Sequence, residues 1–342
     1  MHAHTRRTIV TTIKIVLAVA ILAFLIFQAR GAFAQLSKKT IEWRFLAAAL
    51  VCSMVAASLG FVRWHILIRA LGIGARLIDT LRLGALGFAL NFVSPGSIGG
   101  DFFKAVFLAH GQPGMRTEAV ATVVADRILG LLTMLVIASI GILSTGLLSA
   151  PSEALRALCQ AILIVTAIGW AGFILLMLVG ALSGPWMCQH VERYPIVGKT
   201  AAKLLGAVHV YRNRKWMLAG AFAVSTVMAL CVVTVFYFVA RGLPIHEPPW
   251  AEHLVIVPVA GLVGAIPLTP SGLGTTEFAV EALYKAMPGG DMIEKGDGTL
   301  VGFGRRLTDI AVALVGLGFY LSHRREVQEV FAEAEQEADR EE

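Results

Sequence analysis

Residues 91–104 read N-F-V-S-P-G-S-I-G-G-D-F-F-K, and they place a proline, three glycines and an aspartate inside an otherwise apolar region. Residues 267–277, P-L-T-P-S-G-L-G-T-T-E, interrupt a second apolar region in the same way. Hydrocarbon does not tolerate unpaired backbone groups, so such breaks persist only where protein or water covers them. Two breaks at corresponding places in two half-chains predict a transport-type site between the halves.

The composition is typical of a membrane protein. Hydrophobic residues make up 57% of the 342 residues and charged residues only 15%, whereas soluble domains carry about 25% charged residues. Several apolar runs reach the roughly 20 residues that a helix needs to cross a bilayer. We therefore expect an all-α polytopic membrane protein. The four cysteines are isolated from one another, so no metal site, disulfide framework or cofactor is expected.

The net charge of +6 hides an uneven distribution. Residues 326–342 contain eight acids and one arginine, which leaves 28 basic and 15 acidic residues in the rest of the chain. In a membrane protein this excess indicates basic cytoplasmic loops and attraction to anionic lipid head groups. The basic residues flank the apolar runs and form no aromatic-laced face, which argues against nucleic acid as a partner.

The apolar runs predict six full spans and two broken, re-entrant helical hairpins. The first run resembles a signal peptide, but its roughly 19 residues exceed the usual apolar core of 7–15, so a retained span is favoured over cleavage. The flippase-like domain would cover residues 1–325, with half one at about 1–150, half two at about 151–325, and an acidic cytoplasmic tail at 326–342. The expected spans are residues 9–27, 45–62, 118–148, 158–182, 216–240 and 300–321, and the expected hairpins are residues 80–110 and 253–287.

The loop charges predict a topology with both termini in the cytoplasm. If each hairpin returns to its side of entry, the basic connections at residues 63–76 and 183–215 lie inside, as the positive-inside rule requires. The connection at residues 30–44 disagrees, because its four basic residues would lie outside. Two complete short spans in place of each hairpin would give the same sides.

Three crossings per half would invert the second half relative to the first, so that the hairpin tips approach each other near the midplane. We therefore expect an inverted repeat in a multi-pass protein of the plasma (inner) membrane.

The hairpin residues are the first candidates for substrate binding. Prolines end helices, and glycines permit tight turns and the close approach of a ligand. Asp101 begins the returning helix of the first hairpin, and Glu277 takes the matching place in the second. Each acid is interpreted as a helix cap, beside N–H groups that can also bind phosphate. The candidates are Pro95, Gly96, Gly99, Gly100, Asp101 and Lys104 in the first hairpin, and Pro270, Gly272, Gly274 and Glu277 in the second.

Charged residues inside the spans are the second group of candidates, since ionisable groups in a membrane usually face a partner or an internal path. Asp126 and Arg127 either form a buried structural ion pair or line that path. Arg305 and Arg306 either contact the substrate or extend to the outer interface. Lys104 is either a phosphate contact or an interfacial lysine. The histidines expected to face solvent are His65, His209, His246 and His253.

These motifs resemble the flippase-like transmembrane domain of the lysylphosphatidylglycerol synthases. The resemblance rests on S-P-G-S-I-G-G-D at residues 94–101, on Asp126 and Arg127, on P-x-x-P-x-G-x-G-x-x-E at residues 267–277, and on an arginine at residue 305 or 306. It implies the movement of a lipid with a phosphate head group across the bilayer. Two departures are Lys104, where arginine is common, and Asp126 in place of glutamate. Because no aminoacyl-transferase domain follows residue 321, we expect a stand-alone member that is not an enzyme.

The leading hypothesis is a lipid flippase without its own ATPase, since no nucleotide-binding motif is present. Its expected partners are membrane lipids with an anionic or phosphate-bearing head group. One alternative is a non-catalytic assembly partner of a lipid-biosynthesis enzyme, with the acidic tail as its contact. Another is a membrane-embedded lipid phosphotransferase, which would need three of the acids Asp101, Asp126, Glu277 and Asp309 to converge on a metal ion.

Overall fold

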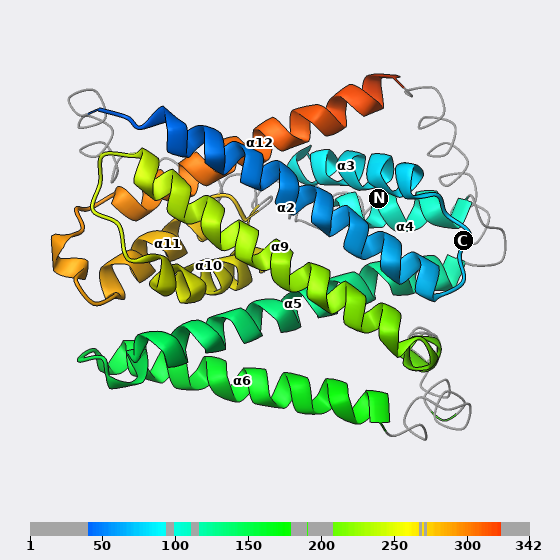
Figure 1. Ribbon diagram of the computed structural model, residues 1–342, viewed down its shortest axis with the longest axis horizontal. Helices are drawn as coiled ribbons and strands as arrows, with labels where there is room; N and C mark the ends of the chain where they lie inside the picture. The colour runs from blue at the N-terminus through cyan, green and yellow to red at the C-terminus, as the bar shows by residue number, and fades with distance from the viewer. Residues whose placement is uncertain are drawn as a thin grey trace, which may run out of the picture.

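The computed structural model describes residues 40–93, 99–110, 116–178, 190, 208–266, 269 and 272–322. Every secondary-structure element within these ranges is a helix (Figure 1). The predicted first span, the acidic tail, Pro95, Gly96 and Pro270 lie outside the described residues. The elements are α2 (Trp43–Ala70), α3 (Leu77–Val93), α4 (Gly99–His110), α5 (Arg116–Thr145), η1 (Leu147–Ser149), α6 (Glu153–Leu178), α9 (Lys215–Gly242), α10 (Trp250–Ala265), α11 (Thr275–Ala286), η4 (Gly290–Met292) and α12 (Asp297–Ser322).

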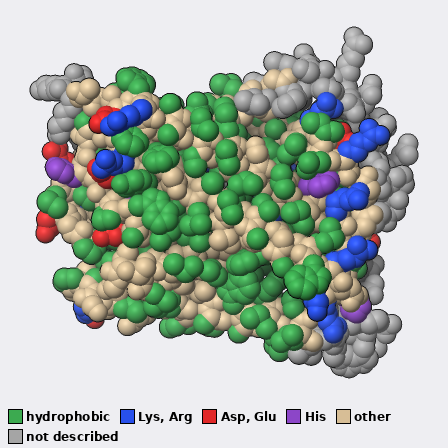
Figure 2. Space-filling view, viewed as in Figure 1, with side chains coloured by type: hydrophobic (Ala, Val, Ile, Leu, Met, Phe, Trp, Pro, Cys, Tyr) green, Lys and Arg blue, Asp and Glu red, His purple; other side chains and the backbone are tan. Residues whose placement is uncertain are grey.

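Four of these helices, α2, α5, α6 and α9, are long and apolar enough to cross a membrane. Helix α12 has 26 residues, which at 1.5 Å per residue also exceeds the roughly 30 Å of a hydrocarbon core. Apolar side chains cover the middle of the molecule, and charged side chains gather at its two ends (Figure 2). The prediction of an all-α, multi-pass membrane protein is therefore confirmed.

Helices α2 and α9 form an antiparallel pair along the length of the molecule (Figure 1). At one end the Glu42 N–H donates to the Gly242 carbonyl oxygen at 3.0 Å. Toward the other end Arg63 Nη1 donates to Ser225 Oγ at 2.9 Å. Gly242 permits the close packing, because a Cβ there would lie 2.6 Å from Leu46 Cδ2.

Two pairs of short helices occupy opposite ends of the molecule. Helices α3 and α4 lie together at one end and α10 and α11 at the other (Figure 1). Gly100 allows the arms of the first pair to meet, since a Cβ there would overlap the Gly87 carbonyl oxygen. Gly272 does the same in the second pair: its φ is +64° and an added Cβ would lie 2.6 Å from the Gly264 oxygen. Both glycines therefore meet the predicted need for close backbone approach.

The first helix of each pair packs against a long helix of the other half of the chain. The first arm α3 packs against α12 of the other half, and α10 likewise packs against α5. The returning arms stay within their own halves, so that α4 packs against α5 and α11 against α12. These four contacts form two matched pairs, and α3 and α10 interlock the two halves of the chain.

The helix bounds differ from the predicted ones most clearly at α2. The prediction ended this span at residue 62 and placed Arg63 and Arg69 in a basic connection, but the helix continues to Ala70. The prediction was wrong at Arg63, whose side chain is buried inside the bundle. Arg63 is tolerated there because Asp126 of α5 neutralises its charge.

Candidate functional site

The returning arm of the first hairpin begins with a cluster of three charges. Asp101 is the third residue of α4, and its carboxylate accepts a hydrogen bond from Arg127 Nε of α5. Lys104 Nζ, one turn along α4, lies 3.4 Å from the same carboxylate and 5.5 Å from the ring centre of Trp64. The Lys104 side chain is only 13% exposed, because it packs against Asp101 and Trp64.

The second hairpin repeats this arrangement with different residues. Glu277 is the third residue of α11, and it is almost fully buried at 1% exposed. Its Oε2 accepts from the Gly274 N–H at 2.7 Å, which caps the helix, while its Oε1 accepts from Arg306 Nε at 2.6 Å. Arg306 Nη2 also reaches the Gly272 carbonyl oxygen at 3.4 Å. Glu277 therefore acts as the predicted cap and also joins α11 to α12.

The same geometry thus occurs twice. In each half an acid at the third position of the returning arm pairs with an arginine on the span that follows. The two pairs differ in burial: Glu277 and Arg306 are both largely buried, whereas Asp101 is largely buried and Arg127 is 47% exposed. A buried ionised group needs a partner and hydrogen bonds to offset the loss of hydration. Each pair joins the first turn of a returning arm to the long helix that follows it.

Asp126 is not a member of either of these acid–arginine pairs. Arg63 donates to Asp126 through Nε and Nη2 at 2.7 and 3.0 Å, and through Nη1 to Ser225 at 2.9 Å. This bidentate contact joins α2, α5 and α9. Asp126 is therefore in a structural ion pair, as one of the two alternatives proposed, but its partner is Arg63 and not Arg127. Asp126 is not among the described lining residues of the cavity reported below. Arg63 was missed from the sequence because it was assigned to a loop.

Arg305 pairs with Asp309 one turn along α12, and its Nη1 also donates to Thr308 Oγ1 at 3.2 Å. Its guanidinium carbon lies 5.8 Å from the ring centre of Phe236. Arg305 Nε is buried and has no hydrogen-bond partner among the described residues. A buried donor left without an acceptor costs about 1–3 kcal/mol. Arg305 therefore turns along α12 toward Asp309 and lies beside Phe236.

A central cavity of about 280 Å³ connects these groups. Its wall includes residues of α3, α5, α9, α10, α11 and α12, so both halves of the chain contribute to it. Arg127 enters it from the first half, while Arg305 and Arg306 enter it from the second. The described lining residues are Phe88, Asn91, Arg127, Met134, Val232, Phe236, Val257, Gly261, Thr276, Glu277, Gly302, Arg305, Arg306 and Asp309.

The ionised side chains in this wall favour an anion. Three arginines face two carboxylates among the described lining residues, which leaves one positive charge in excess. Guanidinium groups recognise carboxylate and phosphate oxygens through paired, charge-assisted hydrogen bonds. The remaining wall is mostly apolar, so an anion that enters exchanges hydration for these contacts in a region of reduced dielectric.

Of the predicted site residues, the structure places Arg127, Glu277, Arg305 and Arg306 in the cavity wall. Asp101 and Lys104 lie behind Arg127, where they position its guanidinium. Gly99 and Gly100 begin α4, and Gly272 and Gly274 precede α11 with positive φ angles of 64° and 84°. These four glycines shape the hairpins and are not among the described lining residues.

Sequence reasoning overlooked Asn91, although it opens the stretch that interrupts the first apolar region. Its Oδ1 accepts a hydrogen bond from the Gly100 N–H at 3.0 Å, and it also lines the cavity. Asn91 thus satisfies a donor at the start of α4. Its position just before a proline and glycine break was the signal that could have identified it.

The expectation that all four histidines face solvent was wrong for His253. This residue is fully buried at 0% exposed, with Nε2 at 2.8 Å from the Tyr284 hydroxyl and Nδ1 at 3.1 Å from the Pro249 oxygen. Burial follows from its face of α10, which packs between α9 and α11.

The acids required by the phosphotransferase alternative do not cluster in the described part of the chain. No group of three His, Cys, Asp or Glu side chains there is close enough to hold a metal ion. Asp101, Asp126, Glu277 and Asp309 each face a basic side chain instead.

Two interlocked helix pairs, with arginines around a central cavity, define a class of multi-pass helical membrane protein. The chain belongs to the family of the lysylphosphatidylglycerol synthase TM region, whose sequence profile matches residues 12–322. It is also similar to the UPF0104 membrane protein PH1989 of Pyrococcus horikoshii. The two are 23% identical over 271 residues, which cover 71% of this chain and 77% of the relative.

Proposed function

We propose that this protein translocates a lipid with a phosphate-bearing head group across the bilayer, as a flippase-like protein without its own ATPase. The observation that carries the proposal is the central cavity in which Arg127 of one half meets Arg305 and Arg306 of the other. A phosphate group matches the guanidinium geometry, and the excess positive charge favours it. Membership of the lysylphosphatidylglycerol synthase TM region family agrees with a lipid as the ligand.

The two halves would form an inverted repeat with one re-entrant hairpin in each. The matched contacts support this view, since α3 packs on α12 as α10 packs on α5. The equivalent helices α2 and α9 are antiparallel, as a twofold axis in the membrane plane requires. The hairpins would then enter from opposite sides of the membrane and meet at the cavity.

Alternating access would follow from rocking of one half against the other. The pairs Asp101–Arg127 and Glu277–Arg306 keep each tip attached to its own half, so the halves can move as units. The head-group phosphate would pair with the Arg305 guanidinium and share Arg127 with Asp101. Movement would then transfer the head group between the arginines of the two halves. In this role the protein makes and breaks no covalent bond.

The charge at the two ends supports a topology with the α2 C-terminus and the α9 N-terminus in the cytoplasm. Arg69 and Lys215 lie at that end, where basic side chains predominate (Figure 2), and acids are frequent at the opposite end. The positive-inside rule then predicts cytoplasmic chain termini. A plasma membrane location remains part of this proposal.

The test is a scrambling assay with purified protein in phosphatidylcholine liposomes that contain fluorescent phosphatidylglycerol, with dithionite quenching of the outer leaflet. Arg305→Gln should slow lipid movement by about tenfold or more, because one hydrogen bond to a charged group contributes about 1.5–3 kcal/mol. Arg305→Lys keeps the positive charge but loses the planar fork of donors. Its scrambling rate should therefore lie between those of the wild type and Arg305→Gln.

Arg214→Gln is the matched control, since it removes an exposed arginine just before α9 that lies outside the described cavity wall. Equal scrambling by the Arg305→Gln and Arg214→Gln proteins would refute the mechanism. Equal scrambling by the wild-type protein and empty liposomes, for every phosphate lipid tested, would refute the function.

A further inference from the structure

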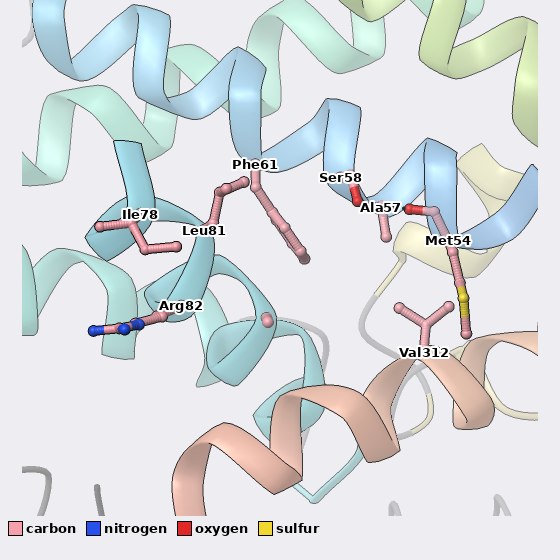
Figure 3. Close-up of a pocket in the computed structure, with 9 residues that line it drawn as sticks. Met54, Ala57, Ser58, Phe61, Ile78, Leu81, Arg82 and Val312 are labelled. Atoms are coloured by element: carbon pink, nitrogen blue, oxygen red, sulfur yellow. Dashed lines mark hydrogen bonds between the residues drawn. The ribbon is translucent and has the colours of Figure 1, made fainter. Parts of the chain in front are cut away.

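A second cavity lies on the outer surface, between α2, α3 and α12 (Figure 3). Its volume is about 290 Å³. In this view Ile78 and Arg82 lie at one end of the groove, Phe61 lies between, and Met54 and Val312 face each other at the other end. The lining residues are Met54, Ala57, Ser58, Phe61, Ile78, Leu81, Arg82, Ala85 and Val312.

The groove is lined mainly by apolar side chains and has one positively charged side chain, Arg82, in its wall. Met54 and Ile78 are 40% and 50% exposed, so apolar surface is open on the membrane-facing side of the bundle. Arg82 is exposed in the second turn of α3, and it has no ion-pair partner within the described part of the chain. It lies near the end of the molecule where Arg69 and Arg76 also lie. An amphiphile with an apolar tail and an anionic head matches both features.

The groove is short, and its charge complements an anionic amphiphile. From Met54 to Phe61 the groove follows α2 for about 10 Å at 1.5 Å per residue. An exposed guanidinium beside apolar surface complements an anionic lipid, whose acyl chain can lie along the apolar residues while its phosphate pairs with the arginine.

The groove shares its helix faces with the central cavity. On α3, Leu81 and Ala85 line the groove, and Phe88 at the next helical step lines the cavity. On α12, Val312 lines the groove, and Asp309 lines the cavity at the preceding step. Residues three or four apart lie on the same side of a helix, so the groove and the central cavity lie along the same sides of α3 and α12.

We propose that this groove is a lateral docking site for an anionic phospholipid, with an acyl chain between α2 and α12 and the head group at Arg82. The site is distinct from the arginine-lined central cavity, and its occupation does not depend on translocation. If the proposed function holds, the shared helix faces make the groove the lateral approach to the centre. The Arg82 guanidinium then selects anionic lipids before they reach the three cavity arginines.

The test is photolabelling in phosphatidylcholine nanodiscs that contain phosphatidylglycerol with a diazirine on one acyl chain, followed by mapping of the labelled peptides. Label should appear on the α2 peptide with Ala57 and the α12 peptide with Val312. Arg82→Gln should lower it by about fivefold, the factor that one basic residue contributes at an anionic lipid surface. Ala57→Trp fills the groove and should remove the label.

Matched controls are Arg214→Gln, and Ala171→Trp on the exposed face of α6. Both should label like the wild type. Equal labelling by a phosphatidylcholine probe, or labelling unchanged by Arg82→Gln and Ala57→Trp, would overturn the proposal. Crosslinking of Ala57→Cys to the apolar run at residues 9–27 would also overturn it, since the chain itself would then fill the groove.

The Arg305→Gln protein separates this proposal from the proposed function. It should keep wild-type labelling of the groove while it loses lipid scrambling. Normal labelling by a wild-type protein that scrambles no lipid would support the docking site and refute translocation. Loss of groove labelling in Arg305→Gln would refute a separate site.

Discussion

Replacement of Glu277 tests whether the hairpin tip depends on its buried ion pair. The carboxylate is 1% exposed and holds both the Gly274 N–H and Arg306 Nε, whose side chain is 16% exposed. Glu277→Ala leaves the arginine without its partner inside the bundle. Removing one member of a buried ion pair costs about 3–5 kcal/mol, mainly because the other charge remains buried.

The expected change in thermal stability follows from this free energy. For chains of a few hundred residues, 1 kcal/mol corresponds to about 2–4 °C in Tm, so Glu277→Ala should lower Tm by roughly 6–20 °C. Glu277→Gln retains an acceptor for the Gly274 N–H and should recover about 1 kcal/mol of this loss. Size-exclusion chromatography of detergent-solubilised protein after a temperature series measures the shift.

Glu247 provides the control, because its pair with Arg241 has the same chemistry at an exposed site, with the arginine 45% exposed. Exposed pairs contribute about 0–1 kcal/mol, so Glu247→Ala should change Tm by only a few degrees. The double variant Glu277→Ala/Arg306→Met should be less destabilised than the sum of its single variants. Tm shifts of equal size for Glu277→Ala and Glu247→Ala would refute the reasoning.

Two further changes test the packing. Gly100→Ala should prevent accumulation of folded protein, because its Cβ would overlap the backbone of the opposing helix. Gly220 has open space around it, so Gly220→Ala should be neutral or slightly stabilising. Equal yields of the two variants by fluorescence-detected chromatography would contradict this. Arg63→Met leaves Asp126 buried without its partner and should lower the free energy of unfolding by about 3–5 kcal/mol. Adding Asp126→Asn should restore part of this loss. A double variant less stable than Arg63→Met would contradict the ion-pair account.

The sequence alone identified the class of protein and the position of both hairpins. Composition and run length decide whether a chain enters a membrane, and both are properties of the sequence. The predicted hairpin arms at residues 253–266 and 275–287 agree closely with α10 and α11. Proline and glycine act locally, through backbone geometry, so their effect does not depend on distant contacts.

The charged candidates were also visible in the sequence, because an ionisable residue in an apolar run is costly wherever it lies. Their partners were not. Asp126 and Arg127 are adjacent in the chain but about 100° apart around α5. One therefore faces Arg63 of α2, and the other faces Asp101 of α4.

Only the tertiary structure decided which side chains share the central cavity. Arg127 and Arg305 are 178 positions apart, and they meet because α3 packs on α12 and α10 on α5. The burial of His253 has the same origin, since the neighbouring helices α9 and α11 cover it. Local sequence determines that a hairpin forms, whereas the packing of two halves against each other determines what its tip faces.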